Sequence, residues 1–311
     1  MDTICGVDVS KNVLDAFVAS SGVFGQFSND VDGIAALSRF CQAQGVDLVV
    51  MEATGGYEKM AYLLLWQSEV KCAIVHAASV RHHAQAMGML EKTDRIDAMV
   101  IASYAAARRV VACDPPSIDQ MRLKALVTRL SQVTSDLAIQ KQRLSSTFDA
   151  EARASLAEVV ALLKRQASRL EGEIASMIDD DPLWAKLAEV FSSIKGVAGR
   201  TIATLMAELP EIGLVSNKAV AKLAGLAPLA DDSGRRKGQR HIRGGRQRVR
   251  SILFLVAGIA RKYDASLDDF HRRLTEAGKP KMVVRIALAH KLLVRLNAKA
   301  REARMEMQNA T

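Results

Sequence analysis

The sequence predicts an α/β domain followed by a long helical segment and an all-α domain. Short β-branched runs alternate with helical stretches over residues 1–112, which is typical of an α/β fold. Between Pro116 and Pro182 the apolar residues recur at steps of three and four, as in a coiled coil. Residues 182–311 read as helices joined by turns. We therefore expect domains at 1–112, 113–181 and 182–311.

The first domain is predicted to contain five strands and four helices. The second strand alternates apolar and polar residues, and Asp30 is a good N-cap for the first helix. Gly55 and Gly56 interrupt the chain between the fourth strand and the next helix. The expected strands are 3–9, 13–18, 22–27, 47–51 and 70–75, and the expected helices are 29–43, 57–67, 77–90 and 92–111.

The middle segment has two heptad seams. Leu123, Leu130 and Val133 belong to the first, and Val160, Leu170 and Ile174 belong to the second. Two helices of this kind either pack on each other as a hairpin or pair with another subunit, and the pattern leaves both open. A contact between subunits is the interpretation we favour from the sequence.

The last domain opens with a candidate helix–hairpin–helix. Lys195, Gly196 and Gly199 surround a Val-Ala turn, and a helical stretch follows over 200–209. Glycines at such a turn allow backbone N–H groups to reach a phosphate beside a helix N-terminus. The alternative is an ordinary helix–turn–helix of the core.

Composition restricts the class of protein. Of 311 residues, 43 are basic and 34 acidic, which gives a net charge of +9. The charge is uneven, because residues 1–114 carry −4 and residues 115–311 carry +13. A basic body of this kind is typical of nucleic-acid binders, although a merely basic surface would look the same. Four scattered cysteines, no apolar run of membrane length and no basic leader favour a protein of the reducing cytosol.

Four acidic residues form the sharpest motif. Asp8 lies inside an apolar strand, and Glu52 ends another. Asp94 and Asp97 are three residues apart on a predicted helix and so share a face. Carboxylates that converge need a counter-charge, and Mg²⁺ (or Mn²⁺) with its preference for oxygen ligands supplies one. Taken singly, Glu52 or Asp97 could equally cap a helix or pair with a nearby cation.

The second motif is a basic segment broken by glycines, which follows Ser233. It has eight basic residues and no acidic residue between positions 235 and 250. Guanidinium groups and free backbone N–H groups in such a segment match phosphate oxygens, so we expect it to bind nucleic acid. A solvated loop is the alternative, and from composition alone Ser233 is an ordinary turn residue. The basic residues are Arg235, Arg236, Lys237, Arg240, Arg243, Arg246, Arg248 and Arg250.

Together these motifs resemble the DEDD transposases of insertion-sequence family 110, which include the Piv-type DNA invertases. The resemblance rests on Gly6-Val-Asp-Val-Ser-Lys11, Glu52-Ala-Thr-Gly-Gly-Tyr57, Lys92-Thr-Asp-Arg-Ile-Asp97, Gly225-Leu-Ala-Pro228, Asp232-Ser-Gly234 and Gly244-Gly-Arg246. They occur in the family's order and cover nearly the whole chain.

The resemblance implies a fold and an activity. It implies an N-terminal RuvC-like (RNase H-fold) domain whose metal ligands are Asp8, Glu52, Asp94 and Asp97. It also implies that Ser233 attacks a DNA phosphate and forms a covalent phosphoserine link. From their charge, Lys11, Arg235 and Arg236 are candidates to hold that phosphate. The acidic domain of one protomer would work with the serine domain of another.

The same resemblance implies the partners of the protein. They are donor and target DNA, a structured non-coding guide RNA (bridge RNA), and further copies of the chain in a dimer or tetramer. The expected location is the bacterial cytoplasm, at the nucleoid. Two other readings remain: a RuvC-like nuclease that uses the same acids with water as nucleophile, and a nucleic-acid-binding scaffold without catalysis.

Overall fold

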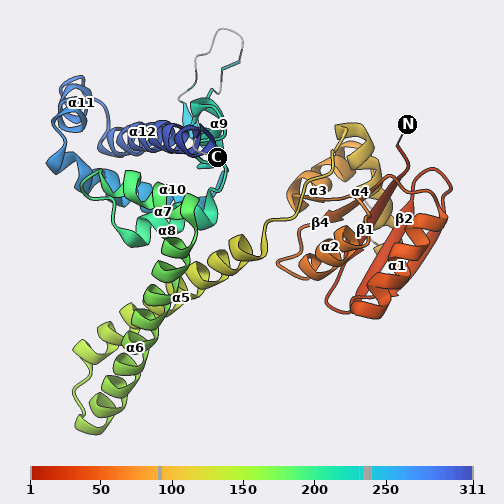
Figure 1. The fold of residues 1–311 in the computed structure, drawn as a ribbon, viewed down its shortest axis with the longest axis horizontal. Helices are drawn as coiled ribbons and strands as arrows, with labels where there is room; N and C mark the ends of the chain where they lie inside the picture. Colours follow the sequence, from red (N-terminus) through yellow and green to blue (C-terminus); the bar gives the residue numbers. More distant parts are fainter. Residues whose placement is uncertain (1, 90–92, 231, 234–237, 239, 310–311) are drawn as a thin grey trace. The chain divides into compact units, whose positions relative to one another are not determined.

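The computed structural model describes residues 2–89, 93–230, 232–233, 238 and 240–309. It consists of two compact units, Met1–Pro116 and Ser117–Thr311, each of which has its own core (Figure 1). Within the described residues, none of the helices combines the length and the apolarity needed to cross a membrane.

The first unit is built on a mixed five-stranded sheet. Its strand order is β3-β2-β1-β4-β5. Strand β2 is antiparallel to both of its neighbours, β1 and β3, whereas β4 is parallel to β1 and β5 is parallel to β4. This arrangement confirms the predicted α/β class. The strands are β1 (Ile4–Val9), β2 (Val13–Val18), β3 (Phe24–Ser28), β4 (Leu48–Glu52) and β5 (Cys72–Val75).

Helices cover both faces of this sheet, because alternate residues of its strands are apolar on both sides. Ile4 and Val50 pack with Ile101 and Ala102 of one helix, whereas the odd-numbered positions of β1 and β4 join a second cluster on the opposite face. The helices are α1 (Val31–Ala43), α2 (Glu58–Gln67), α3 (Ala77–Ala86) and α4 (Asp94–Arg108). The Asp30 carboxylate caps α1 as predicted and accepts from Gly33 N at 2.8 Å.

The second unit is mostly helical. Its first two helices, α5 (Ile118–Ser146) and α6 (Ala150–Asp180), pack on each other as a hairpin, so the heptad seams are buried within one chain (Figure 1). The same helices continue into the core of the unit instead of forming a separate segment. The helices are α5 (Ile118–Ser146), α6 (Ala150–Asp180), α7 (Pro182–Ser192), α8 (Gly199–Glu208), α9 (Asn217–Leu223), α10 (Gln247–Ala260), α11 (Ala265–Glu276) and α12 (Lys281–Asn309).

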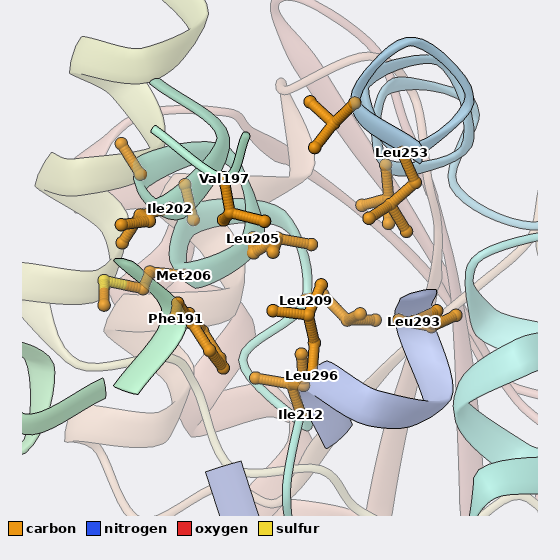
Figure 2. Packing of buried hydrophobic residues seen from close by; sticks show 14 of the residues in the cluster. Phe191, Val197, Ile202, Leu205, Met206, Leu209, Ile212, Leu253, Leu293 and Leu296 are labelled. Atoms are coloured by element: carbon orange, nitrogen blue, oxygen red, sulfur yellow. The ribbon is translucent and has the colours of Figure 1, made fainter. Parts of the chain in front are cut away.

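A dense apolar cluster holds α7, α8, α10 and α12 together (Figure 2). Phe191, Leu205 and Leu209 are fully buried in it and meet Leu253 of α10 and Leu296 of α12. Each such side chain stabilises the fold by about 1.5–3 kcal/mol relative to exposure. The cluster therefore fixes the starts of α8 and α10 relative to each other.

A two-stranded ribbon interrupts the helices of this unit. β6 (Pro228–Leu229) pairs antiparallel with β7 (His241–Ile242), where the sequence predicts only a glycine-broken loop. The ribbon is too short to be read from alternation, and its pairing depends on the two ends of the segment meeting. Ser233 lies in the stretch of chain between the two strands of the ribbon.

Candidate functional site

Asp8 and Glu52 lie side by side at the ends of two parallel strands. β1 and β4 pair with Val7 opposite Met51, so Asp8 and Glu52 are the next pair in register. Because side chains alternate along a strand, both carboxylates lie on the sheet face that α4 covers. Both residues are half-buried. The sequence prediction that these two acids meet is therefore consistent with the register.

Helix α4 packs closely on the same face, at the residue that follows Asp97. A Cβ built on Gly6 would lie 2.2 Å from Ala98 O and 2.5 Å from Ala102 N, so only glycine permits this contact. Asp97, which precedes Ala98, is half-buried. Thr93 caps the helix by accepting from Ile96 N at 3.3 Å. The side chain of Asp94 lies outside the described residues.

The donor chemistry of this edge fits a hard divalent cation. Carboxylate oxygens are the ligands that Mg²⁺ and Mn²⁺ prefer, and burial raises the cost of leaving them without a counter-charge. Among the described side chains, however, no three His, Cys, Asp or Glu residues converge closely enough to hold an ion. The described residues thus do not form a complete cation site by themselves.

A further carboxylate, which sequence reasoning missed, lies next to Asp8. Asp15 of β2 is the register partner of Asp8 and is only 4% exposed. Gln26, its partner on β3, donates from Nε2 to Asp15 Oδ1 at 2.8 Å. Directly opposed residues share a face, so Glu52, Asp8, Asp15 and Gln26 form one polar row across four strands. The available signal was a charged residue at a core-facing position of an otherwise apolar strand.

The turn that follows Glu52 is held by Glu58. Its carboxylate accepts from Gly56 N at 2.8 Å, from Thr54 N at 3.2 Å and from Thr54 Oγ1 at 3.1 Å. Burial acts to raise the pKa of Glu58. The hydrogen bonds to its carboxylate lower the pKa by a larger amount, so the pKa lies below the ordinary value. The motif that begins at Glu52 therefore forms a turn that is stabilised by hydrogen bonds to the Glu58 carboxylate.

Ser233 is exposed in the second unit, on the segment between β6 and β7. Arg235, Arg236 and Lys237, which follow it, lie outside the described residues. Arg240 and Arg243 are exposed. The serine hydroxyl is thus accessible to a large substrate on its own unit.

We call the part of the chain from Gly225 to Gly245, which carries Ser233, the serine segment. Its two ends are in close backbone contact. Gly225 and Gly245 have φ of +66° and +71°, in the region that favours glycine. A Cβ on Gly225 would lie 2.3 Å from Gly244 O, and one on Gly245 would lie 2.2 Å from Gly225 N. These contacts explain the glycines of both flanking motifs. They define the neck of the serine segment, by which we mean Gly225, Gly244 and Gly245.

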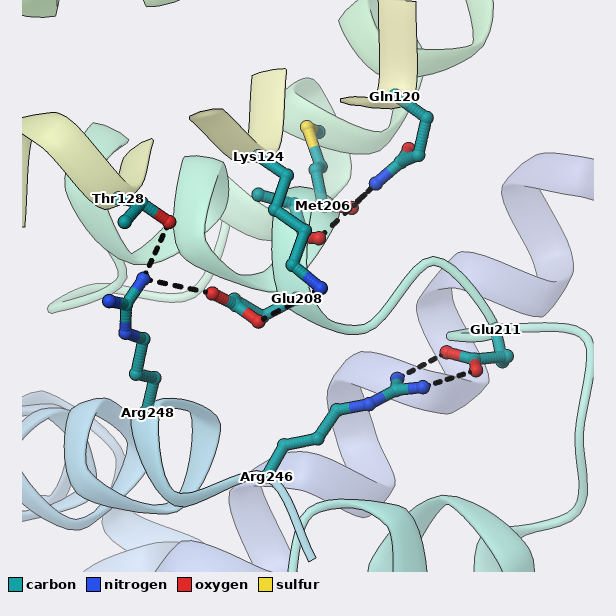
Figure 3. A network of polar contacts seen from close by, with 9 residues as sticks. Gln120, Lys124, Thr128, Met206, Glu208, Glu211, Arg246 and Arg248 are labelled. Atoms are coloured by element: carbon teal, nitrogen blue, oxygen red, sulfur yellow. Dashed lines mark hydrogen bonds and ion pairs between the residues drawn. The ribbon is translucent and has the colours of Figure 1, made fainter. Parts of the chain in front are cut away.

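Three of the predicted phosphate-binding arginines make contacts within the unit, and Figure 3 shows two of them, Arg246 and Arg248. Arg246 forms a double hydrogen bond with Glu211, at 2.5 Å on each side. Arg248 donates to Thr128 Oγ1 at 2.7 Å and to Glu208 Oε1 at 3.1 Å, and Arg250 donates to Gly244 O at 2.6 Å. These side chains connect α10 to its neighbours and to the neck.

The other residues that the sequence predicts to bind nucleic acid lie in two turns, one before α8 and one between β1 and β2. Gly196 has φ of +97° and packs against the end of α10, with its Cβ position 3.0 Å from Ala260 N. Lys195 is exposed, and Gly199 begins α8 as an exposed residue. Lys11 is exposed between β1 and β2.

Comparisons with known proteins identify the family. Residues 5–151 match the model of the DEDD transposases of IS110, and residues 188–272 match the transposase model of the IS116/IS110/IS902 family. The chain belongs to the IS110 family of transposases, enzymes that cut and rejoin DNA. The pilin gene-inverting proteins of Moraxella lacunata and Moraxella bovis are each 26% identical over 303 residues, covering 94% of this chain and 93% of theirs. Among solved structures, RuvC of Thermus thermophilus matches with a TM-score of 0.26 and 11% identity, covering 35% of this chain and 98% of its own.

Proposed function

We propose that this IS110-family transposase recombines DNA through a covalent link to Ser233, assisted by Mg²⁺ at the DEDD residues. The first unit is then a RuvC-like, RNase H-fold domain. The observation that supports the proposal is the register of β1 and β4, in which Asp8 and Glu52 are neighbours on the face that α4 packs against at the residue after Asp97. Asp94 would complete the set of ligands. A bound divalent cation would stabilise charge on the oxygens of the phosphate that reacts.

The chemistry assigned to Ser233 is a transesterification. Its Oγ attacks the phosphorus of a DNA phosphodiester, the Oγ–P bond forms, and the bond to a deoxyribose oxygen breaks. That oxygen leaves as a hydroxyl after it receives a proton, while the serine loses its own. Because the phosphoserine keeps the phosphodiester energy, a second deoxyribose hydroxyl can displace Ser233 and rejoin the DNA without ATP.

The acids and the serine belong to different compact units. We propose that the first unit of one protomer works with the second unit of another in a dimer or tetramer. The strong charge contrast between the N-terminal and later residues, −4 against +13, fits one unit that binds cations and one that binds nucleic acid. We further propose a non-coding guide RNA as partner, and action on donor and target DNA in the bacterial cytoplasm. The gene inversion named for the Moraxella relatives is a reaction of the same class.

The deciding experiment is capture of the protein–DNA adduct and mapping of the modified residue. Purified protein is incubated with recombining DNA, Mg²⁺ and co-purified RNA, and adducts are resolved on a denaturing gel and mapped by mass spectrometry. We expect an adduct on Ser233, lost in Ser233→Ala and kept in the exposed-serine control Ser145→Ala. Asp8→Asn should abolish both adduct and recombination while DNA binding persists.

Two results would reject the proposal in different ways. Cleavage that persists in Ser233→Ala but fails in Asp8→Asn identifies a metal-dependent nuclease that uses water. Nucleic-acid binding with no cleavage by the native protein, unchanged by either substitution, identifies a scaffold.

A further inference from the structure

A groove of about 600 Å³ lies between α5, α8 and α10 of the second unit. Its floor is apolar and is formed by residues such as Leu130, Ala203 and Ile252. Its walls are polar. They are formed by Ser131 and Ser135 of α5, Arg200 of α8, and Gln247, Arg248 and Ser251 of α10.

The wall residues are chiefly donors. Ser131, Ser135, Gln247 and Ser251 are exposed, and their hydroxyl or amide groups can donate to an acceptor. By contrast, the two threonines of the groove already donate to carbonyls of their own helices. Among the described residues that line the groove, none is acidic. The groove is therefore complementary to an anion that offers acceptors.

The two arginines of the groove have different roles. Arg248 is held by Thr128 and Glu208, so it fixes α10 against α5 and shapes the wall (Figure 3). Arg200 pairs with Glu171 at 2.6 Å, but these two side chains are 48% and 50% exposed. An exposed pair contributes little to stability because water screens it. Arg200 can therefore exchange Glu171 for a phosphate at low cost.

The starts of α8 and α10 add to this potential. Five helices of the unit (α5, α6, α7, α9 and α11) begin with a Ser or Asp side chain that accepts from the first turn. No described side chain caps α8 or α10. The first turns of both helices, through Arg200 and Gln247, border the groove. Their N–H groups and dipoles favour negative charge at this place.

From these observations we infer that the groove binds the sugar–phosphate backbone of a nucleic acid. Hydroxyl, amide and guanidinium donors would contact phosphate oxygens, and the apolar floor would receive the sugar faces. The inference rests on the proposed function, because it assigns nucleic acid to the second unit. It adds a binding surface on α5 and α8, apart from the serine segment.

The test uses a charge placed in the groove and the same charge placed outside it. Ser135→Asp adds a carboxylate to the wall at an exposed helical position, and Gln142→Asp adds one on the same helix, about 10 Å further along. At 0.1 M salt this distance is close to the screening length. Each variant adds one negative charge, so the two have equal net charge, and both should unfold at the same temperature in thermal melts.

The probes are a 20-nucleotide single-stranded DNA, an RNA of the same sequence and the DNA duplex, with binding followed by fluorescence anisotropy. Ser135→Asp should weaken binding of the preferred probe about fivefold, and Gln142→Asp should change it by less than about twofold. Arg200→Gln should lower the slope of log affinity against log salt by about one. The probe that responds most identifies DNA or RNA as the occupant.

Each other result overturns the inference. If Ser135→Asp and Gln142→Asp bind alike, the groove is not used, and recombination that still depends on Ser233 would leave the proposed function intact. If native protein binds no probe, the groove and the nucleic-acid part of the proposed function both fail. If Ser135→Asp leaves binding unchanged but shifts the sedimentation of the protein, the groove is a protein interface.

Discussion

The Arg246 guanidinium donates two hydrogen bonds to the Glu211 carboxylate, each at 2.5 Å. The pair links the turn after α8 to the residue that precedes α10, across 35 positions of sequence. Arg246 N also donates to Leu223 O at 2.8 Å, beside the neck. Arg246 is thus placed to hold the base of the serine segment, in contrast to the direct phosphate contact that the sequence predicts for it.

Removing the charge of Glu211 should destabilise the second unit. In Glu211→Gln the half-buried guanidinium loses its charged partner, and we expect a loss of about 1–2 kcal/mol in the free energy of unfolding. Urea denaturation followed by circular dichroism measures it. Asp269→Asn, which removes one of the two acidic partners of the well-exposed Arg272, is the control and should change little. Equal effects of the two substitutions would contradict this role of the pair.

Glu211 should also make stability depend on acid. Burial acts to raise the pKa of Glu211, but the hydrogen bond and charge of Arg246, a backbone hydrogen bond and the charge of Lys124 together lower it by more, so the pKa in the folded protein lies below the ordinary value. A lowered carboxyl pKa contributes stability that is present above the unfolded value of about 4.3 and is lost as pH falls through the folded pKa. Thermal melts between pH 6 and pH 3 should therefore show a steeper loss for the native protein than for Glu211→Gln. Parallel curves would exclude the effect.

Two substitutions in the neck of the serine segment should separate the cost of backbone strain from the cost of steric overlap. Gly244→Ala adds a Cβ at φ of +68° with no atom within 4 Å, so it should cost only the conformational strain of about 1–2 kcal/mol. Gly245→Ala adds the same strain and a Cβ at 2.2 Å from Gly225 N, so it should cost clearly more. Denaturation midpoints measure both, and limited proteolysis should cut the Gly245→Ala segment faster. Equal costs would show that the neck opens without penalty.

Much of the fold could be predicted because it depends on local patterns. β-branched alternation predicts β1 and β2, and the Asp30 cap predicts the start of α1. The ends of α3 and α4 differ from prediction, since α3 ends at Ala86 instead of position 90 and α4 at Arg108 instead of position 111. Gly88, at φ of +71°, is a stop signal that follows the end of α3 directly and that the prediction passed over. Helix α4 ends where Arg109 takes the left-handed conformation, at φ of +50°, and an arginine gives no such signal in the sequence.

Contacts between distant residues could not be predicted in the same way. The heptad pattern of residues such as Leu123 and Leu170 does not identify the partner of each seam. From the sequence we favour another subunit, whereas the three-dimensional packing shows a hairpin within one chain. The pairing of Arg246 with Glu211 is also invisible in the sequence, because a basic segment offers many equivalent arginines. Local chemistry selected the acids Asp8 and Glu52, whereas their neighbour Asp15 required the strand register.

The pair Asp8 and Asp15 provides the last prediction. Like charges directly opposite each other on a sheet are destabilising, and Asp15 is almost fully buried. Asp15→Asn keeps the shape and can still accept from Gln26, so in EDTA it should stabilise the first unit by about 0.5–1 kcal/mol. The gain should vanish when Asp8 is already Asn, because the double-mutant cycle isolates the interaction between the two carboxylates. Thermal melts of the four proteins measure it, with the exposed Asp136→Asn as control. The same gain in both backgrounds would mean that Asp15 acts independently of Asp8, and the polar row would then have no electrostatic coupling at its centre.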